Sequence, residues 1–196
     1  TENLRALPPH VLARISLEND ERVFTIQDAL HICGQLGLPA IFDVFHHSLN
    51  PPAHGTQTYW LDRVVETWGA AHGRPKLHYS QQLAGGKPGM HSRSIAMQDF
   101  LEFHRSMEDR ELDVMLEVKD KNLSAVKCAH LAGARLPRQE LTDQWARYKY
   151  LVLERDQAAY NGIRTLLKAE APDAKTFYGI IEQALEKELS GPQARN

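Results

Sequence analysis

Short apolar runs that end in a polar or charged side chain recur along the first two thirds of the chain. The strands predicted from these runs cover about residues 14–18, 39–44, 74–79 and 112–117. A segment with apolar residues at helical spacing follows each run. Strand–helix units in succession predict parallel strands joined by right-handed crossovers. The pattern therefore predicts an α/β fold built from (β/α) units of the TIM-barrel type.

The first predicted helix has the clearest boundaries. Thr25 is a suitable N-cap, and Asp28 three residues later completes a variant of the capping box. Gly37 is expected to end this helix. The apolar spacing predicts further helices within residues 60–72, 97–104 and 123–132.

The number of units sets the expected domain organisation. A closed barrel of this type needs eight strand–helix units, and the chain has four. We therefore expect residues 1–137 to form the C-terminal half of a barrel whose N-terminal half is missing. Residues 138–196 keep helical spacing without a cluster of metal-capable side chains. This region is expected to be a helical extension of two or three helices.

Composition narrows the class of protein. The 196 residues are 42% hydrophobic with a net charge of −2, which is typical of a globular protein. That charge argues against binding nucleic acid through a broad basic surface, but it allows a nuclease whose positive charge comes from metal ions. No apolar run is long enough to cross a membrane, and no export leader is recognisable. Cys33 and Cys128 fit reduced thiols in predicted helices, so we expect a cytoplasmic protein.

Metal-capable side chains stand at the ends of the predicted strands. One comes from each strand: Glu18, Asp43, His78 and Glu117. Any one of these carboxylates alone is more often a turn former or a surface charge. A barrel brings the carboxyl ends of its strands together, so the coincidence favours a shared site. Carboxylate and imidazole ligands suit manganese, iron or zinc.

Other candidates flank these ligands. His46 follows at the expected junction of strand and loop, and can reach an adjacent ion. His91 follows the glycine-rich loop at residues 83–89 and can swing back to the site. Lys76 is two residues before His78 and thus on the same strand face. It either pairs with Glu18 or Glu117, or is carboxylated and acts as an anion.

Five short motifs occur in order along the chain. They are Leu17–Asp20, Phe42–His47, Lys76–Ser80, His91–Ser92 and Asp113–Lys121. Together they resemble the UV damage endonuclease family over about residues 12–131. The resemblance implies a TIM-barrel enzyme of DNA repair, acting in nucleotide excision, that cuts the backbone 5′ of UV photoproducts. It also implies a cluster of two to three divalent metal ions, usually manganese (Mn2+).

The resemblance assigns roles to individual residues. It implies that the central metal ion is held by Glu18, Asp43, His78 and Glu117. These ligands would act in catalysis through a hydroxide that is bound to the metal and attacks phosphorus. His46 and His91 would serve a neighbouring ion, while Glu18 bridges towards a third. Lys76 matches a lysine that can be carboxylated in this family. Lys87 and Arg93 are candidate phosphate contacts, with a solvated surface role as the alternative.

The expected partners are UV-damaged double-stranded DNA and the missing N-terminal half of the barrel. Two other hypotheses stay open. A metal-dependent sugar isomerase uses similar ligands at strand ends of a similar barrel. Alternatively, the half-barrel is not catalytic and pairs its open strand edges with a second copy to form a homodimer.

Overall fold

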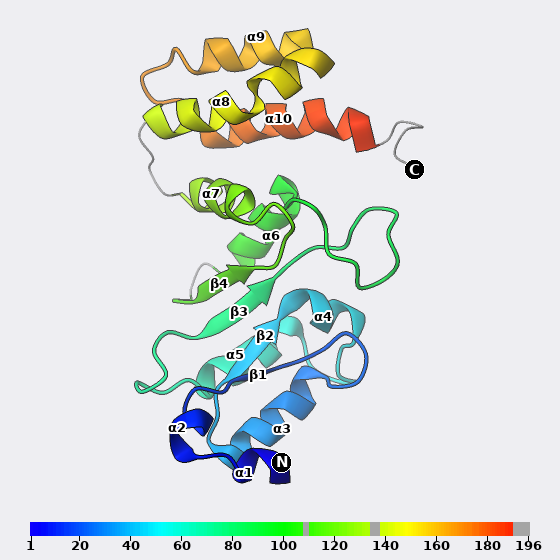
Figure 1. The fold of residues 1–196 in the computed structure, drawn as a ribbon, viewed down its shortest axis with the longest axis vertical. Helices are drawn as coiled ribbons and strands as arrows, with labels where there is room; N and C mark the ends of the chain where they lie inside the picture. The colour runs from blue at the N-terminus through cyan, green and yellow to red at the C-terminus, as the bar shows by residue number, and fades with distance from the viewer. Residues whose placement is uncertain (108–109, 134–137, 190–196) are drawn as a thin grey trace. The chain divides into compact units, whose positions relative to one another are not determined.

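The computed structural model describes residues 1–107, 110–133 and 138–189 (Figure 1). It divides into two compact units, which are residues 1–94 with 109–121, and residues 95–108 with 122–196. The predicted boundary between residues 137 and 138 stays a prediction, because residue 137 lies outside the described residues.

A four-stranded parallel sheet organises the first unit. Its strands are β1 (Leu17–Glu18), β2 (Ala40–Asp43), β3 (Lys76–Tyr79) and β4 (Asp113–Leu116), in the order β1-β2-β3-β4. Asp43 pairs in register with His78, so these two strand ends lie level. The α/β class predicted from the alternating pattern is confirmed.

Strand β1 is shorter than predicted. The prediction covered residues 14–18, whereas the strand holds only Leu17 and Glu18. The N–H groups of Arg14 and Ile15 instead donate to the carbonyls of Val11 and Leu12, at 3.0 and 3.1 Å. These local bonds continue the preceding helical turn and remove both donors from the sheet.

Five helices belong to the first unit among its described residues. They are α1 (Glu2–Arg5), α2 (Pro9–Leu12), α3 (Ile26–Leu36), α4 (Val44–Leu49) and α5 (Gln57–Glu66). The predicted capping box at Thr25 and Asp28 is present, and Gly37 ends α3 with a φ of 65°. Such a left-handed conformation is accessible to glycine at little steric cost. Helix α5 ends before the predicted stop near residue 73.

Helix α4 replaces the loop that the sequence led us to expect after β2. The Asp43 side chain caps it by accepting a hydrogen bond from the His46 N–H at 2.8 Å. One residue therefore ends a strand and starts a helix. This arrangement fixes His46 on a helical turn rather than on a flexible connection.

The core of the first unit lies between the sheet and its helices. Helices α3 and α5 pack against β2, which buries Ala40 and Phe42 completely. Trp68 donates its indole N–H to the Ala40 carbonyl at 2.6 Å, and the Thr67 hydroxyl accepts from the Ala40 N–H at 2.9 Å. These bonds anchor the beginning of β2, leaving its carboxyl end for the site.

The second unit is helical in its described part. It contains α6 (Met97–Ser106), α7 (Asn122–Leu131), α8 (Arg138–Arg155), α9 (Gln157–Leu166) and α10 (Ala174–Leu189). Helix α10 packs against the other four. The predicted helical extension is thus present as α8, α9 and α10.

Buried polar contacts attach α10 to α6 and α7. The Lys127 ammonium lies 2.7 Å from the Glu182 carboxylate, and both Glu182 oxygens accept from the Met97 N–H at 3.0 Å. The Tyr178 hydroxyl lies 3.0 Å from His130 Nδ1 in the same core. Helix α10 is therefore an integral part of this unit.

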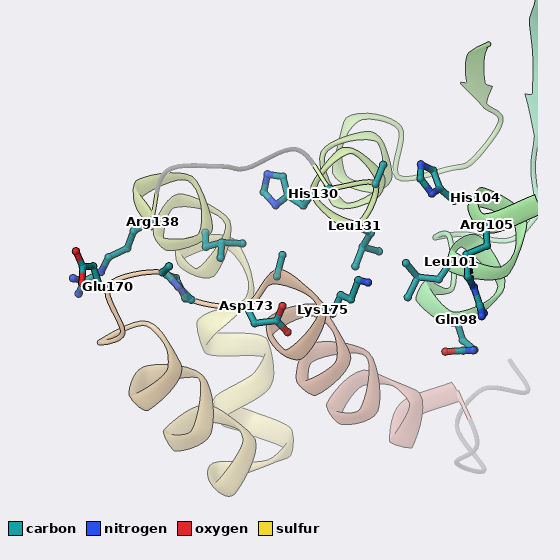
Figure 2. Close-up of a pocket in the computed structure, with 16 residues that line it drawn as sticks. Gln98, Leu101, His104, Arg105, His130, Leu131, Arg138, Glu170, Asp173 and Lys175 are labelled. Atoms are coloured by element: carbon teal, nitrogen blue, oxygen red, sulfur yellow. Dashed lines mark hydrogen bonds between the residues drawn. The ribbon is translucent and has the colours of Figure 1, made fainter. Parts of the chain in front are cut away.

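A cavity of about 1050 Å³ opens in the second unit (Figure 2). Its walls carry the basic side chains Arg105, Arg138 and Lys175 as well as the acidic Glu170 and Asp173. Asp173 already accepts hydrogen bonds from the N–H and hydroxyl groups of Thr176, both at 2.7 Å. Because the charges are mixed, this cavity indicates no particular class of ligand.

Two further findings concern the predicted cellular setting. Cys33 and Cys128 are buried and are not joined in a disulfide, as expected. Within the described ranges, no helix combines the length and apolar character needed to cross a membrane.

Candidate metal centre

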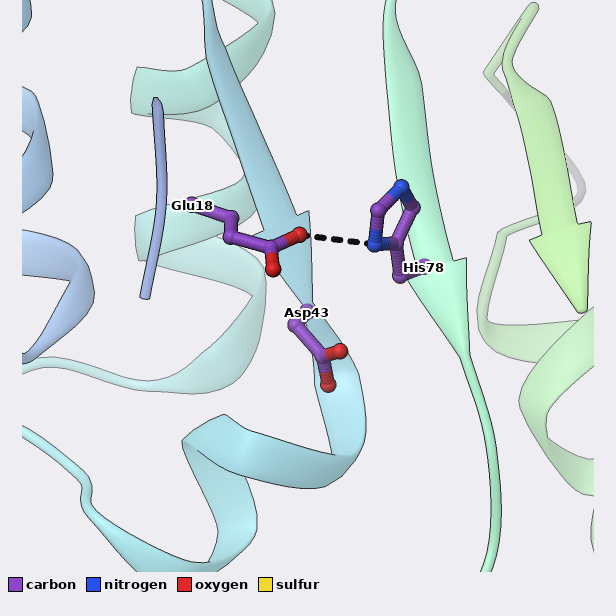
Figure 3. Close-up of side chains that lie close together, drawn as sticks. All are labelled: Glu18, Asp43 and His78. Carbon is purple, nitrogen blue, oxygen red and sulfur yellow. Dashed lines mark ion pairs between the residues drawn. The ribbon is translucent and has the colours of Figure 1, made fainter. Parts of the chain in front are cut away.

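Three of the predicted ligands converge at the carboxyl ends of β1, β2 and β3. Glu18, Asp43 and His78 each direct one ligand atom to this point, and these atoms lie within 4.8 Å of one another (Figure 3). Two ligands of one ion, each bonded at about 2.1 Å, can be at most about 4.2 Å apart. Small movements of these side chains would bring them around one cation.

Asp43 provides the strongest evidence that the cluster fits a cation. Its side chain is completely buried at the end of β2. Oδ1 accepts from the His46 N–H, whereas Oδ2 accepts no hydrogen bond among the described residues, although His46 Nδ1 lies 3.3 Å away. Burial raises the pKa of Asp43 most; the His46 N–H bond and the nearby His46 ring oppose this shift, while Glu117 and Glu18 add to it. A buried carboxylate oxygen without a donor is costly, and a metal ion would satisfy it.

Glu18 and His78 interact directly within the cluster. Glu18 Oε2 lies 2.7 Å from His78 Nδ1. This contact lowers the pKa of Glu18 and raises the pKa of His78, while burial opposes both shifts. The pair therefore favours a carboxylate beside an imidazolium.

The remaining predicted ligands adjoin this cluster. Glu117 Oε1 lies 3.3 Å from His78 Nδ1, and its Oε2 lies 3.9 Å from His91 Nδ1. His46 Nδ1 lies 3.3 Å from Asp43 Oδ2, and the His46 and His91 rings are 5.8 Å apart between centroids. All six side chains proposed as ligands thus gather at one edge of the sheet.

The predicted lysine and arginine positions lie differently. Lys76 is exposed at the start of β3, with its Nζ 5.7 Å from the centre of the Trp68 ring. One of the two explanations for Lys76 was an ion pair with Glu18 or Glu117. No such ion pair is present among the described residues. Lys87 and Arg93 are both exposed, on the connection between β3 and α6.

Two residues near the cluster were not singled out from the sequence. Asn19 is completely buried; its amide donates to the Asp43 carbonyl at 2.9 Å and accepts from the Asp43 N–H at 3.0 Å. Glu21 Oε2 lies 4.0 Å from His46 Nε2. Both residues follow Glu18 within three positions. Their roles depend on how β1 pairs with β2, and a short sequence motif does not specify that pairing.

The fold and the cluster define a class of protein: an α/β protein with parallel strands whose carboxyl ends gather carboxylate and imidazole ligands. Residues 1–142 match the sequence family described as UV-endonuclease UvdE. The chain belongs to this family.

Individual relatives agree with the family assignment. The chain is 33% identical to the UV DNA damage endonuclease of Clostridium perfringens over 180 residues, covering 88% of this chain and 42% of the relative. It is 30% identical to the UV DNA damage endonuclease of Bacillus pumilus over 128 residues, covering 64% and 40%. The crystal structure of SacUVDE superposes with a TM-score of 0.59 at 41% identity, covering 65% of this chain and 42% of that one.

These comparisons also set the extent of the match. The chain spans about two fifths of the length of these curated relatives. The solved relative is a TIM-barrel enzyme, and the four parallel strands fit part of such a barrel.

Proposed function

We propose that this chain forms part of the active site of a DNA repair endonuclease that hydrolyses the phosphodiester 5′ of UV photoproducts in double-stranded DNA. The observation that carries the proposal is the buried, donor-free Oδ2 of Asp43 beside Glu18 and His78. Membership of the UV-endonuclease family supports DNA as the substrate over the sugar considered above.

The six clustered side chains would share the work of holding metal ions. Glu18, Asp43, His78 and Glu117 would hold a central ion, and His46 with His91 a neighbouring one. Bound divalent ions would lower the pKa of a coordinated water and neutralise phosphate charge. A mixed oxygen and nitrogen ligand set is compatible with manganese, and we propose two to three ions.

The chain itself would control the protonation of the site. An imidazole binds metal only when neutral, so His78 must release the proton that Glu18 helps it to hold. Asp43 is held rigidly by its capping bond and by Asn19, so its free oxygen keeps a fixed direction. The ligands would thus be oriented before any ion binds.

Three basic residues would support the reaction from the surroundings. Lys87 and Arg93 are exposed and would contact DNA phosphates. Carboxylation of Lys76 would turn it from a cation into an anionic ligand, and would require it to leave the Trp68 ring. A mass increase of one carbon dioxide on the peptide containing Lys76 would identify this modification.

The outer strand suggests how the sheet is completed. Within the described residues β4 has no neighbour beyond β3, and it exposes Val114 and Met115 to 40% and 54%. We propose that further strands, from the N-terminal half of the family barrel, cover these side chains. A homodimer of this chain is the competing arrangement, and sedimentation with and without the separate half would distinguish them. We also propose a cytoplasmic location, which is supported by DNA as the substrate and by two cysteines that are not joined in a disulfide.

The proposal is tested by comparing Asp43→Asn with Asp99→Asn, an exposed aspartate in α6. Mn2+ affinity should fall in the first variant and stay unchanged in the second, because only Asp43 faces the cluster. Nicking of UV-irradiated plasmid by the chain, assembled with the N-terminal half, should show the same contrast. Unchanged Mn2+ affinity in Asp43→Asn would contradict the proposed centre.

A further inference from the structure

The connection between β3 and α6 folds back on itself as a hairpin before it reaches the cluster. Gln82 and His91 form an antiparallel bridge. The Leu83 N–H donates to the Met90 carbonyl and the Ser92 N–H to the Gln81 carbonyl, both at 2.7 Å. In this pattern the two bridged residues are a non-hydrogen-bonded pair with Cα atoms about 4.5 Å apart. Gln82 therefore stands directly opposite the candidate ligand His91.

The Gln82 side chain binds three backbone groups of this hairpin. Its amide nitrogen donates to the carbonyls of Leu83 and Lys87, at 3.1 and 2.9 Å. Its amide oxygen accepts from the Gly89 N–H at 3.0 Å. One side chain thus connects both strands and the tip of the hairpin.

The hairpin delivers His91 to a defined position. His91 Nδ1 lies 3.1 Å from the Glu117 carbonyl oxygen, and the ring packs edge-on against Phe45 at 5.4 Å. Residues 80–96 form this connection, which is longer than most connections between elements. A free loop of this length would lose considerable conformational entropy when His91 binds an ion. Bonds that order the loop beforehand reduce that loss.

We infer that Gln82 is a positioning residue for His91, fixing the hairpin so that the imidazole is presented to the metal centre. This inference rests on the proposed metal role of His91. Gln82 touches neither substrate nor metal; it acts through the backbone of the loop. Its loss would weaken metal binding without removing a ligand.

Mn2+ affinity of the 196-residue chain gives the first test, measured from the free Mn2+ signal in electron paramagnetic resonance. Gln82→Ala should weaken binding by up to about tenfold, because the exposed hydrogen bonds that order the loop are lost. Gln82→Glu keeps the acceptor for Gly89 but loses both donors, so it should restore part of the affinity. Gln98→Ala, an exposed glutamine on α6, should bind as the unmodified chain does.

Amide hydrogen exchange of the metal-free chain gives a second, independent readout. Gln82→Ala should accelerate exchange at Leu83, Gly89 and Met90, while the amides of α3 and α5 keep their protection. Unchanged exchange at these three positions would overturn the inference, whatever the metal affinity.

His91→Ala separates the failure of the inference from that of the proposed site. If His91→Ala weakens Mn2+ binding and Gln82→Ala does not, Gln82 is no positioning residue, but the metal centre stands. If neither variant changes the Mn2+ affinity, His91 is not a metal ligand. The proposed metal role of His91 and the positioning role of Gln82 then both fail.

Discussion

Replacing Asn19 by alanine removes the amide that joins the ends of β1 and β2. The amide makes two hydrogen bonds to the Asp43 backbone, accepting at 3.0 Å and donating at 2.9 Å, in a fully buried position. Loss of the acceptor leaves the buried Asp43 N–H unpaired, which costs about 1–3 kcal/mol, and the lost second bond adds about 1 kcal/mol. We expect the free energy of unfolding of the first unit to fall by about 2–4 kcal/mol.

Urea denaturation followed by tryptophan fluorescence measures this change. Trp60 and Trp68 belong to the first unit and Trp145 to the second, so a Trp145→Phe background restricts the signal to the first unit. Far-ultraviolet circular dichroism would verify that the variants fold.

Asn50→Ala is the matched control for Asn19→Ala. Its amide makes one described hydrogen bond, to the Asp20 carbonyl at 3.2 Å, in a partly buried position. Its loss should cost only about 1 kcal/mol. An effect of Asn19→Ala no larger than this control would refute the conclusion that the amide holds the two strand ends together.

Two further predictions concern the second unit. Glu182→Ala should lower the free energy of unfolding of this unit by about 3 kcal/mol, because the buried Lys127 loses its carboxylate partner. Urea denaturation of a variant whose only tryptophan is Trp145 measures this change. Glu182→Gln should lower the free energy of unfolding by less. Burial lowers the pKa of His130, with Tyr178 and Glu140 facing its ring. The unfolded chain then binds the proton more readily, so stability falls as pH drops below about 6.5, by at most about 1.4 kcal/mol per pH unit. His130→Gln should show a shallower fall between pH 7 and 5, and an equal slope would contradict the assignment.

The predictable part of the structure rests on local patterns. The capping box at Thr25 and the stop at Gly37 need only neighbouring residues, and both occur as predicted. Strand ends could be located because each apolar run stops at a polar residue. The parallel arrangement then placed Glu18, Asp43 and His78 at one edge before any distance was known.

The rest depends on contacts between distant residues or on competing local bonds. Asp43 was expected to be followed by a loop, but its carboxylate caps α4 instead. The role of Asn19 arises from the pairing of β1 with β2, and that of Gln82 from the hairpin that brings it opposite His91. Lys76 lies two residues before His78 on β3, yet its long side chain reaches the Trp68 ring at 5.7 Å. Spacing along a strand fixes a face but not the direction of a flexible side chain.

The position of bound manganese tests the central claim most directly. Crystals of the chain soaked in manganese chloride, measured at wavelengths on both sides of the manganese absorption edge, would locate each ion by its anomalous scattering. We predict a peak within about 2.5 Å of Glu18 Oε2, Asp43 Oδ2 and His78 Nδ1. Manganese found only at other carboxylates, with no ion at Asp43 Oδ2, would contradict the proposed centre.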